Sequence, residues 1–393
     1  MSDPNIALHR SAEEGPPVTT EEHPPVLQSG GDKGDEINFA PQYKLVWWRF
    51  RKNKLAVIGL VLMAVIYLLA IFCEFLAPKV QDFNRATYSF APPQGLHVAW
   101  DGGPHVYVND WIGTPNAQLL TRDYVVNEDK RIYLRFFAKG DPYEMWGLFR
   151  SDIHFFGPVH ANDAVYLFGA DEQGRDLFSR IIYGTRISMS VGLIGVFLGL
   201  ILGVMLGGIS GYFGGTTDTL IQRGIEFFMS IPTLPLWLGL AAAIPPGLDP
   251  VKGYFLITLI LSLISWTGLA RVVRSRFMQI RGEDYVLAAE LDGVPRMRII
   301  RRHMVPAFTS HIIASLTLSI PGMILGETAL SFLGFGLQAP VVSWGVLLND
   351  AQNIRVLSFA PWLLLPGLVV VITVMALNFV GDGMRDAADP YES

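Results

Sequence analysis

Cysteine and charge are scarce in this 393-residue sequence. The single cysteine, Cys73, cannot form an intrachain disulfide, and in its apolar surroundings it is expected to behave as a small buried hydrophobic residue. Only 17% of the residues are charged and 51% are hydrophobic, whereas about a quarter of the residues in a soluble domain are charged. This composition argues against a soluble protein.

Sequence patterns of common catalytic sites are also missing. The chain contains no Gly-Lys dipeptide, so it lacks the phosphate-binding pattern G-x-x-x-x-G-K-[ST]. It also lacks the H-E-x-x-H pattern of zinc hydrolases and the G-x-S-x-G turn of nucleophilic serines. Four histidines lie without metal-ligand spacing at His97, His105, His154 and His160. We therefore expect no catalytic residue, no metal site and no cofactor bound by this chain.

The most prominent feature of the sequence is a series of long apolar runs. Six of them are long enough to cross about 30 Å of hydrocarbon as helices. They are Leu55–Cys73, Ile187–Tyr212, Leu220–Ile244, Tyr254–Ala270, Ala307–Leu333 and Trp362–Phe379. The sequence therefore predicts an all-α polytopic membrane protein with six transmembrane helices.

Basic residues gather in two segments that alternating spans place on one side. One group precedes the first run and consists of Arg49, Arg51, Lys52 and Lys54. The other consists of eight arginines between the fourth and fifth runs, Arg271, Arg274, Arg276, Arg281, Arg296, Arg298, Arg301 and Arg302. Short basic loops stay in the cytoplasm, so we expect this loop and both termini there.

The segments outside the core differ in character. Residues 1–41 are polar, without a cleavable signal pattern, and predict a disordered cytoplasmic tail. Residues 42–54 join two tryptophans to several cations, which indicates an interfacial helix or ordinary interface residues. The first transmembrane helix would cover 55–77, and 383–393 would form a cytoplasmic tail. Residues 78–184 would be an extracytoplasmic insertion of β-rich or α+β structure, because short aromatic and β-branched runs alternate there with turn residues.

Prolines and one glutamate make the spans candidates for a translocation path. Pro232 and Pro235 are expected to interrupt the third span, and Pro321 the fifth. Such breaks survive where freed backbone groups line a wet cavity, although kinks are common in membrane helices generally. Glu327 has no obvious local partner, so it would line the cavity or lie in water at the outer interface.

The stretch EDYVLAAELDGVPRMRIIRRHMVP, Glu283–Pro306, carries the most specific pattern. Helical spacing puts four residues on one face, which two alanines make flat: Tyr285, Ala288, Ala289 and Asp292. Gly293 suits the left-handed position that ends a helix, and Pro295 suits the first turn of the next. Such a helix–bend–helix within the loop 271–306 could carry motion from a soluble partner into the membrane. The alternative is a basic loop that only sets topology.

This stretch resembles the cytoplasmic EAA loop of ABC import permeases, in which an Ala pair is followed by Gly and a closing Pro. Ala288, Ala289, Gly293 and Pro306 match, whereas Leu287 and Val305 depart from the usual Glu and Leu. Within that family the chain most resembles the second (C-type) permease of dipeptide and oligopeptide importers. Four further stretches carry this resemblance: GADEQGRDLFSRIIYGTRISMSVG, GYFGG, ALSFLGFGLQAPVVSWGVLLND and NFVGDGMRDAADP.

The resemblance implies a type I ABC importer permease fold in a bacterial inner (cytoplasmic) membrane, with five transmembrane helices in a core over 185–382. A second permease would complete a heterodimer, cytoplasmic ABC ATPase subunits would use ATP and Mg, and an extracytoplasmic solute-binding protein would deliver the peptide. Gly293 would supply the bend, and Ala288 with Ala289 the ATPase contact. A charged rim would comprise Glu290, Asp292, Arg298, Arg301 and Arg302. No nucleic acid is expected.

The segment DEQGRDLFSR just before the second span has two readings. Gly174 permits a tight turn among four residues of alternating charge, Asp171, Arg175, Asp176 and Arg180. They would form an ion-paired lip at the outer mouth that meets the binding protein or peptide termini, or a cap that orders the start of the span.

Other functions remain as alternatives. Related permeases move nickel chelates, opines or peptide-like antibiotics. A secondary transporter would need coupling residues on internally repeated halves, and no convincing repeat is present. A membrane receptor would leave the helix–bend–helix unexplained.

Overall fold

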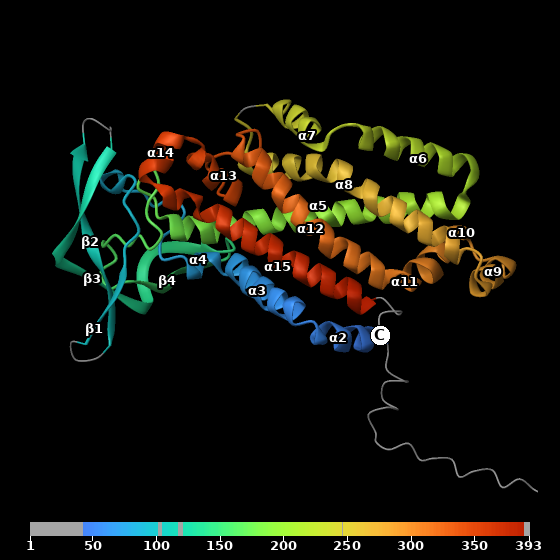
Figure 1. Cartoon of the computed structure of the whole chain (residues 1–393), viewed down its shortest axis with the longest axis horizontal. Helices are drawn as coiled ribbons and strands as arrows, with labels where there is room; N and C mark the ends of the chain where they lie inside the picture. The colour runs from blue at the N-terminus through green and yellow to red at the C-terminus, as the bar shows by residue number, and fades with distance from the viewer. Residues whose placement is uncertain (1–41, 101–103, 117–120, 246, 389–393) are drawn as a thin grey trace, which may run out of the picture. The chain divides into compact units, whose positions relative to one another are not determined.

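The computed structural model describes residues 42–100, 104–116, 121–245 and 247–388, so the predicted tail over 1–41 lies outside it. Within these residues, five helices are long and apolar enough to cross a membrane, which confirms the helical polytopic prediction. They are α3 (Lys54–Ile71), α5 (Leu177–Phe213), α8 (Pro250–Ile280), α12 (Thr309–Phe332) and α15 (Leu365–Ala388). Figure 1 shows how they run alongside one another.

The predicted third span is a bent pair of helices. α6 (Gly215–Ser230) and α7 (Thr233–Ala242) meet at 83°, as a broken span or a re-entrant segment. The break falls at Pro232, whose ring disfavours helical backbone at Ile231, and Ile231 is extended. Pro235 lies inside the first turn of α7, where its missing N–H removes no helical hydrogen bond. The expected interruption is therefore at Pro232 and not at Pro235.

The expected interruption at Pro321 is wrong. α12 runs unbroken from Thr309 to Phe332 with Pro321 inside it. Two other boundaries also differ from the prediction. α5 begins at Leu177, inside the predicted insertion 78–184, and α8 continues to Ile280, inside the predicted loop 271–306.

Glycines bring α5 and α8 together along much of their length. A Cβ added at Gly207 would overlap the carbonyl oxygen of Ala270, and one added at Gly211 would lie 2.6 Å from that of Arg274. Small residues at these positions allow the two backbones to approach closely, as is common between transmembrane helices. α5 also packs against α3 and α12, and so it forms the centre of the bundle.

The insertion contains a four-stranded antiparallel sheet in the order β1-β2-β3-β4, which confirms the predicted β-rich insertion. The strands are β1 (Leu96–Ala99), β2 (His105–Asn116), β3 (Thr121–Met145) and β4 (Phe149–Pro158), and a short helix η1 (Ala86–Tyr88) precedes them. The buried pair Val108 and Ile132 packs with Val165 in a small core of its own. β3 and β4 also contact α4 (Cys73–Leu76), which follows the first span (Figure 1).

Polar contacts fasten the insertion to the first span. Both ring nitrogens of buried His154 lie against backbone carbonyls, at 2.6 Å from Ala77 O and 3.0 Å from Asp141 O. On the bundle side, the guanidinium of Arg186 in α5 donates to both oxygens of Glu74 and to the carbonyl of Ala70. The end of the first span is thus held by both the sheet and α5.

The remaining elements are short. Outside the segment between α8 and α12, they are α2 (Gln42–Lys52), α13 (Trp344–Asn349), η3 (Asp350–Gln352), α14 (Ile354–Phe359) and η4 (Pro361–Leu364). α2 occupies the segment for which an interfacial helix is predicted, and its location at a membrane surface stays a prediction.

Candidate functional site

The segment between α8 and α12 forms two short helices around a sharp bend. α9 (Asp284–Leu291) ends at Asp292, and α10 (Arg296–Ile299) begins after Pro295. Gly293 has φ +74°, and two hydrogen bonds close the helix end: Gly293 N–H to Glu290 O and Val294 N–H to Ala289 O. This pattern is the Schellman motif, which requires a left-handed residue after the helix and so favours glycine.

The inner side of this segment is packed into the bundle. Val286 and Ala289 from α9 lie in one buried core with residues from the ends of α5, α8 and α12: Tyr212, Val273, Phe277, Phe308 and Ile312. Ile299 at the end of α10, and Ile300 and Met304 in the turn that follows it, join the same core. The bend is therefore attached rigidly to three spans. The prediction that Ala289 shares an exposed contact face with Ala288 is wrong, because Ala289 faces this core.

A π-helical turn joins the second helix to α12. η2 (Ile300–Met304) inserts an extra residue per turn and leads into α11 (Val305–Ala307). The turn leaves Arg301 and Arg302 exposed while Ile300 and Met304 are buried.

The outer side of the bend is both apolar and charged. Tyr285, Ala288 and Asp292 are exposed, as the helical spacing predicts. Leu287 and Leu291 are exposed as well, and Leu291, at 88%, is more exposed than the other large hydrophobic residues of the bend. Neither leucine belongs to the predicted contact face, although their spacing of four residues puts both on one side of a helix. With Met297, which is 50% exposed, these leucines give the bend a small apolar surface that a partner could cover.

Charged residues line two hollows at the bend, and both hollows include Pro295. Glu290 and Arg296 lie in the first, together with Tyr212, Phe213, Arg281 and Gly293–Pro295. The hydroxyl of Tyr212 donates to Glu290 there, and the guanidinium of Arg296 lies over the Phe213 ring. The second hollow contains Pro295, Met297, Arg298, Arg301, Arg302 and Pro306. All ten residues predicted for the coupling loop are therefore within this segment, and nine of them face outward or line a hollow.

The predicted outer-mouth motif folds into one compact cluster. Asp171 is fully buried and accepts hydrogen bonds from the guanidinium groups of Arg175 and Arg180. Gly174 has φ +69°, and a Cβ there would overlap the carbonyl oxygen of Arg85. Asp176 caps the start of α5 by accepting from Ser179 N–H, and its burial raises the pKa of its carboxyl group to about 6. These contacts order the start of the span, and a contact of this cluster with the binding protein or peptide termini stays a prediction.

Glu327 is the centre of a hydrogen-bond network inside the protein. It is fully buried and accepts from the hydroxyls of Ser188 in α5, Ser331 in α12 and Ser343 before α13, at 3.2, 2.8 and 2.6 Å. Each of these hydroxyls in turn accepts from a backbone amide, those of Trp344, Leu337 and Val346 respectively. Glu327 therefore has partners that its sequence neighbourhood did not make obvious, and it is buried in this structure, not exposed to water. A role for it in the translocation path stays a prediction. The sequence hides these partners because two of them come from other elements.

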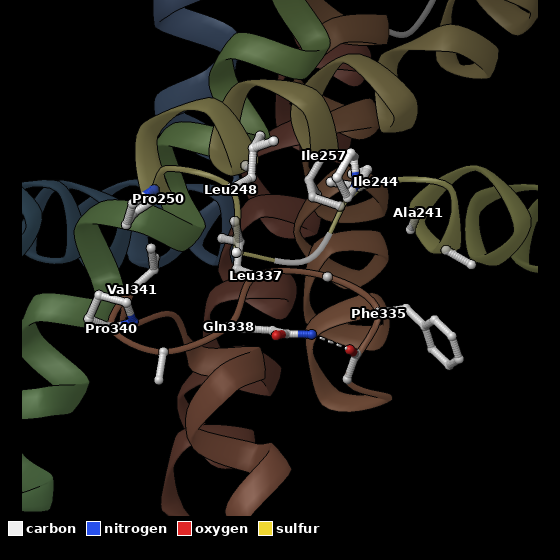
Figure 2. Close-up of a pocket in the computed structure, with 17 residues that line it drawn as sticks. Ala241, Ile244, Leu248, Pro250, Ile257, Phe335, Leu337, Gln338, Pro340 and Val341 are labelled. Atoms are coloured by element: carbon white, nitrogen blue, oxygen red, sulfur yellow. Dashed lines mark hydrogen bonds between the residues drawn. The ribbon is translucent and has the colours of Figure 1, made fainter.

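The predicted path residues do not come together in this structure. Pro232 just before α7 and Pro235 within it are exposed, whereas Pro321 and Glu327 are buried in α12. A cavity of about 450 Å³ lies elsewhere, between the α7–α8 turn and the loop after α12. Figure 2 shows its apolar lining, which includes Ile244, Leu248, Ile257 and Leu337, with Gln338 turned to the carbonyl of Gly334.

Two segments of the chain match known protein families. Residues 179–391 match the family described as the binding-protein-dependent transport system inner membrane component. The chain belongs to this family. Residues 41–93 also match the N-terminal transmembrane domain of oligopeptide transport permease C, which confirms the resemblance to the C-type permeases.

Similar curated proteins agree with this assignment. The chain is 39% identical to the oligopeptide transport system permease protein OppC of Haemophilus influenzae over 62% of its length and 76% of that protein. It is 31% identical to OppC of Bacillus subtilis over 87% of both chains, and 39% identical to the dipeptide permease DppC of that species over 58% and 69%. Among solved structures, the MetNI methionine ABC transporter in an inward facing conformation covers 54% of this chain and 98% of its own, at 17% identity and a TM-score of 0.42.

Family membership and the apolar helices together define the class of molecule. The chain is a multi-pass membrane protein and a permease subunit of a transport system.

Proposed function

We propose that this chain is one transmembrane half of an ATP-driven peptide importer, placed in the bacterial inner membrane with both termini in the cytoplasm. A second permease forms the other half, and a solute-binding protein delivers the peptide outside. Separate ATPase subunits hydrolyse ATP and dock on the bend between α9 and α10. The names of the similar OppC and DppC proteins support the peptide substrate.

One structural relationship carries the coupling role. The bend has an outer side with exposed leucines and charged hollows, and an inner side that shares a core with the ends of three spans. A partner that moves the outer side therefore moves α5, α8 and α12 with it, because close-packed interiors transmit displacement. The substrate passes through without any bond being made or broken.

A charged residue introduced on the outer side of the bend tests whether the ATPase subunits dock there. Leu291→Glu places a carboxylate at the most exposed apolar position of the bend, and Leu96→Glu on β1 is a matched control that is also exposed, at 59%. We expect Leu291→Glu to insert normally but to lose co-purification of the ATPase subunits and uptake of labelled peptides. Leu96→Glu should retain both. Co-purification and uptake by Leu291→Glu at the level of the unmodified protein would contradict the proposal.

Substrate class is tested separately from docking. Cells in which the chromosomal gene is deleted should take up labelled di- and oligopeptides again when a plasmid supplies the gene. Restored uptake of a nickel chelate or an opine, with no peptide uptake, would leave the importer mechanism intact but overturn the peptide assignment.

A further inference from the structure

The turn between β3 and β4 carries large apolar side chains at its tip. Trp146, Leu148 and Phe149 are 47%, 75% and 62% exposed. Phe136 and Phe137 on β3 are also mostly exposed, and both rings contact Phe155 on β4. We call the six side chains the hairpin patch: Phe136, Phe137, Trp146, Leu148, Phe149 and Phe155. Apolar groups of this size rarely gather in water without a function.

The backbone conformation at the tip of the turn is unfavourable for Trp146. Trp146 has φ +54° and is followed by Gly147 at φ +68°, while Leu148 N–H donates to Met145 O across the turn. A left-handed conformation is unfavourable for a residue with a Cβ, so glycine or asparagine would be expected at the first position. Retaining a tryptophan there indicates that its side chain has a role at this place.

The hairpin patch is continuous with the end of the first span. The indole N–H of Trp146 donates to the carbonyl of Ile71, the last residue of α3, at 2.8 Å, and its ring contacts Phe72. Phe75 in α4 contacts the rings of Phe137 and Phe155. Figure 1 shows β4 beside α4 at this end of the bundle.

The level of the tip follows from the length of α3. Its 18 residues span about 27 Å, close to the thickness of the hydrocarbon layer. Its last turn therefore lies at a boundary of that layer, and Trp146 lies at the same level. The outward side chains of α3 remain apolar up to this point, as Val61, Val65, Leu68 and Ile71 show.

We propose that the hairpin patch is a lipid contact in which the β3–β4 turn enters the interface of the outer leaflet. Tryptophan is enriched at this depth because its ring is apolar and its N–H is polar, and phenylalanine and leucine occupy the acyl side. The sheet would thus rest on the bilayer beside the first span, and its orientation would be fixed by lipid as well as by α4. This contact is independent of the transported substrate and of the ATPase.

Fluorescence in nanodiscs tests the proposal with the full chain and its co-expressed partner subunits. Leu148→Cys and Val125→Cys each receive one environment-sensitive thiol probe, with unlabelled buried Cys73 as background. Val125 is a matched control because it is 62% exposed at the opposite end of β3. In lipids with brominated acyl chains, we expect the probe at 148 to lose most of its emission and the probe at 125 to keep it.

Three other results would overturn the proposal. Equal emission of both probes in brominated lipids, with quenching of both by aqueous iodide, would put the tip in water. Shielding of the probe at 148 only when the second permease is present would make the hairpin patch a subunit interface. Shielding only after addition of the binding protein would make it a docking surface for that protein.

Discussion

The hydroxyl of Tyr212 near the end of α5 donates a 2.5 Å hydrogen bond to the carboxylate of Glu290 in α9. Tyr212 is itself buried in the core beneath the bend. Glu290 is thus held by a membrane span, and it belongs to the attachment of the bend as much as to the charged rim predicted from the sequence.

Tyr212→Phe removes this hydrogen bond and keeps the ring. A hydrogen bond to a charged group contributes about 1.5–3 kcal/mol, so we expect a looser bend, with reduced transport-coupled ATP hydrolysis but normal insertion. Glu290→Gln is the control, because its amide oxygen still accepts from Tyr212. Coupled hydrolysis should be measured in proteoliposomes with all subunits. Equal coupling by Tyr212→Phe and the unmodified protein would show that the attachment does not depend on this bond.

Gly293→Ala tests the backbone of the bend. Its φ of +74° costs a residue with a Cβ about 1 kcal/mol, although no atom of the described residues lies within 4 Å of the added atom. Gly282→Ala is the matched control, since it is also exposed and open but has no positive φ. We expect a lower thermal midpoint in detergent for Gly293→Ala only. Gly293→Arg should add loss of ATPase coupling and uptake because its side chain occupies the contact surface. Transport by Gly293→Arg at the unmodified rate would contradict the coupling role.

Local patterns in the sequence are sufficient for much of this architecture. Apolar run length predicts the spans, Gly293 followed by Pro295 predicts the bend, and alternation of aromatic and turn residues predicts the sheet. Contacts between distant segments are not visible in this way. Glu74 and Arg186 pair across two elements, and Glu327 finds Ser188 and Ser343 only after α5, α12 and α13 have packed. Periodicity also cannot tell which alanine of the pair faces the core, because that depends on where α9 contacts the bundle.

Glu327→Leu tests whether the buried carboxylate holds the bundle together. The change leaves three serine hydroxyls without their acceptor, and each buried unsatisfied group costs about 1–3 kcal/mol. We expect strongly reduced thermal stability and little folded protein in the membrane. Glu327→Gln keeps an acceptor, and it should fold and transport. The measurements are the thermal midpoint and peptide uptake. A stable Glu327→Gln variant without uptake would instead assign a role in transport to the charge.

Asp176→Asn should change how stability depends on pH. Burial raises the pKa of Asp176 from 3.8 to about 6, so the folded state binds this proton more tightly than the unfolded state does. The free energy of unfolding then falls as pH rises through this window, and the loss is complete above the folded pKa. Asparagine does not titrate but still accepts from Ser179. Its amide group can occupy the place of Oδ1, the carboxylate oxygen that has no hydrogen-bond partner among the described residues.

The effect of Asp176→Asn on the unfolding temperature therefore has a definite direction at each pH. At pH above about 6, Asp176→Asn should unfold at a higher temperature than the unmodified protein, and the difference should shrink toward pH 4. Thermal unfolding in detergent at several pH values gives the dependence of the unfolding temperature on pH for both proteins. Subtracting one curve from the other removes the contribution of the other carboxylates, which both proteins share. Parallel curves would mean that Asp176 titrates alike in the folded and unfolded states, which its complete enclosure next to Ser179 argues against.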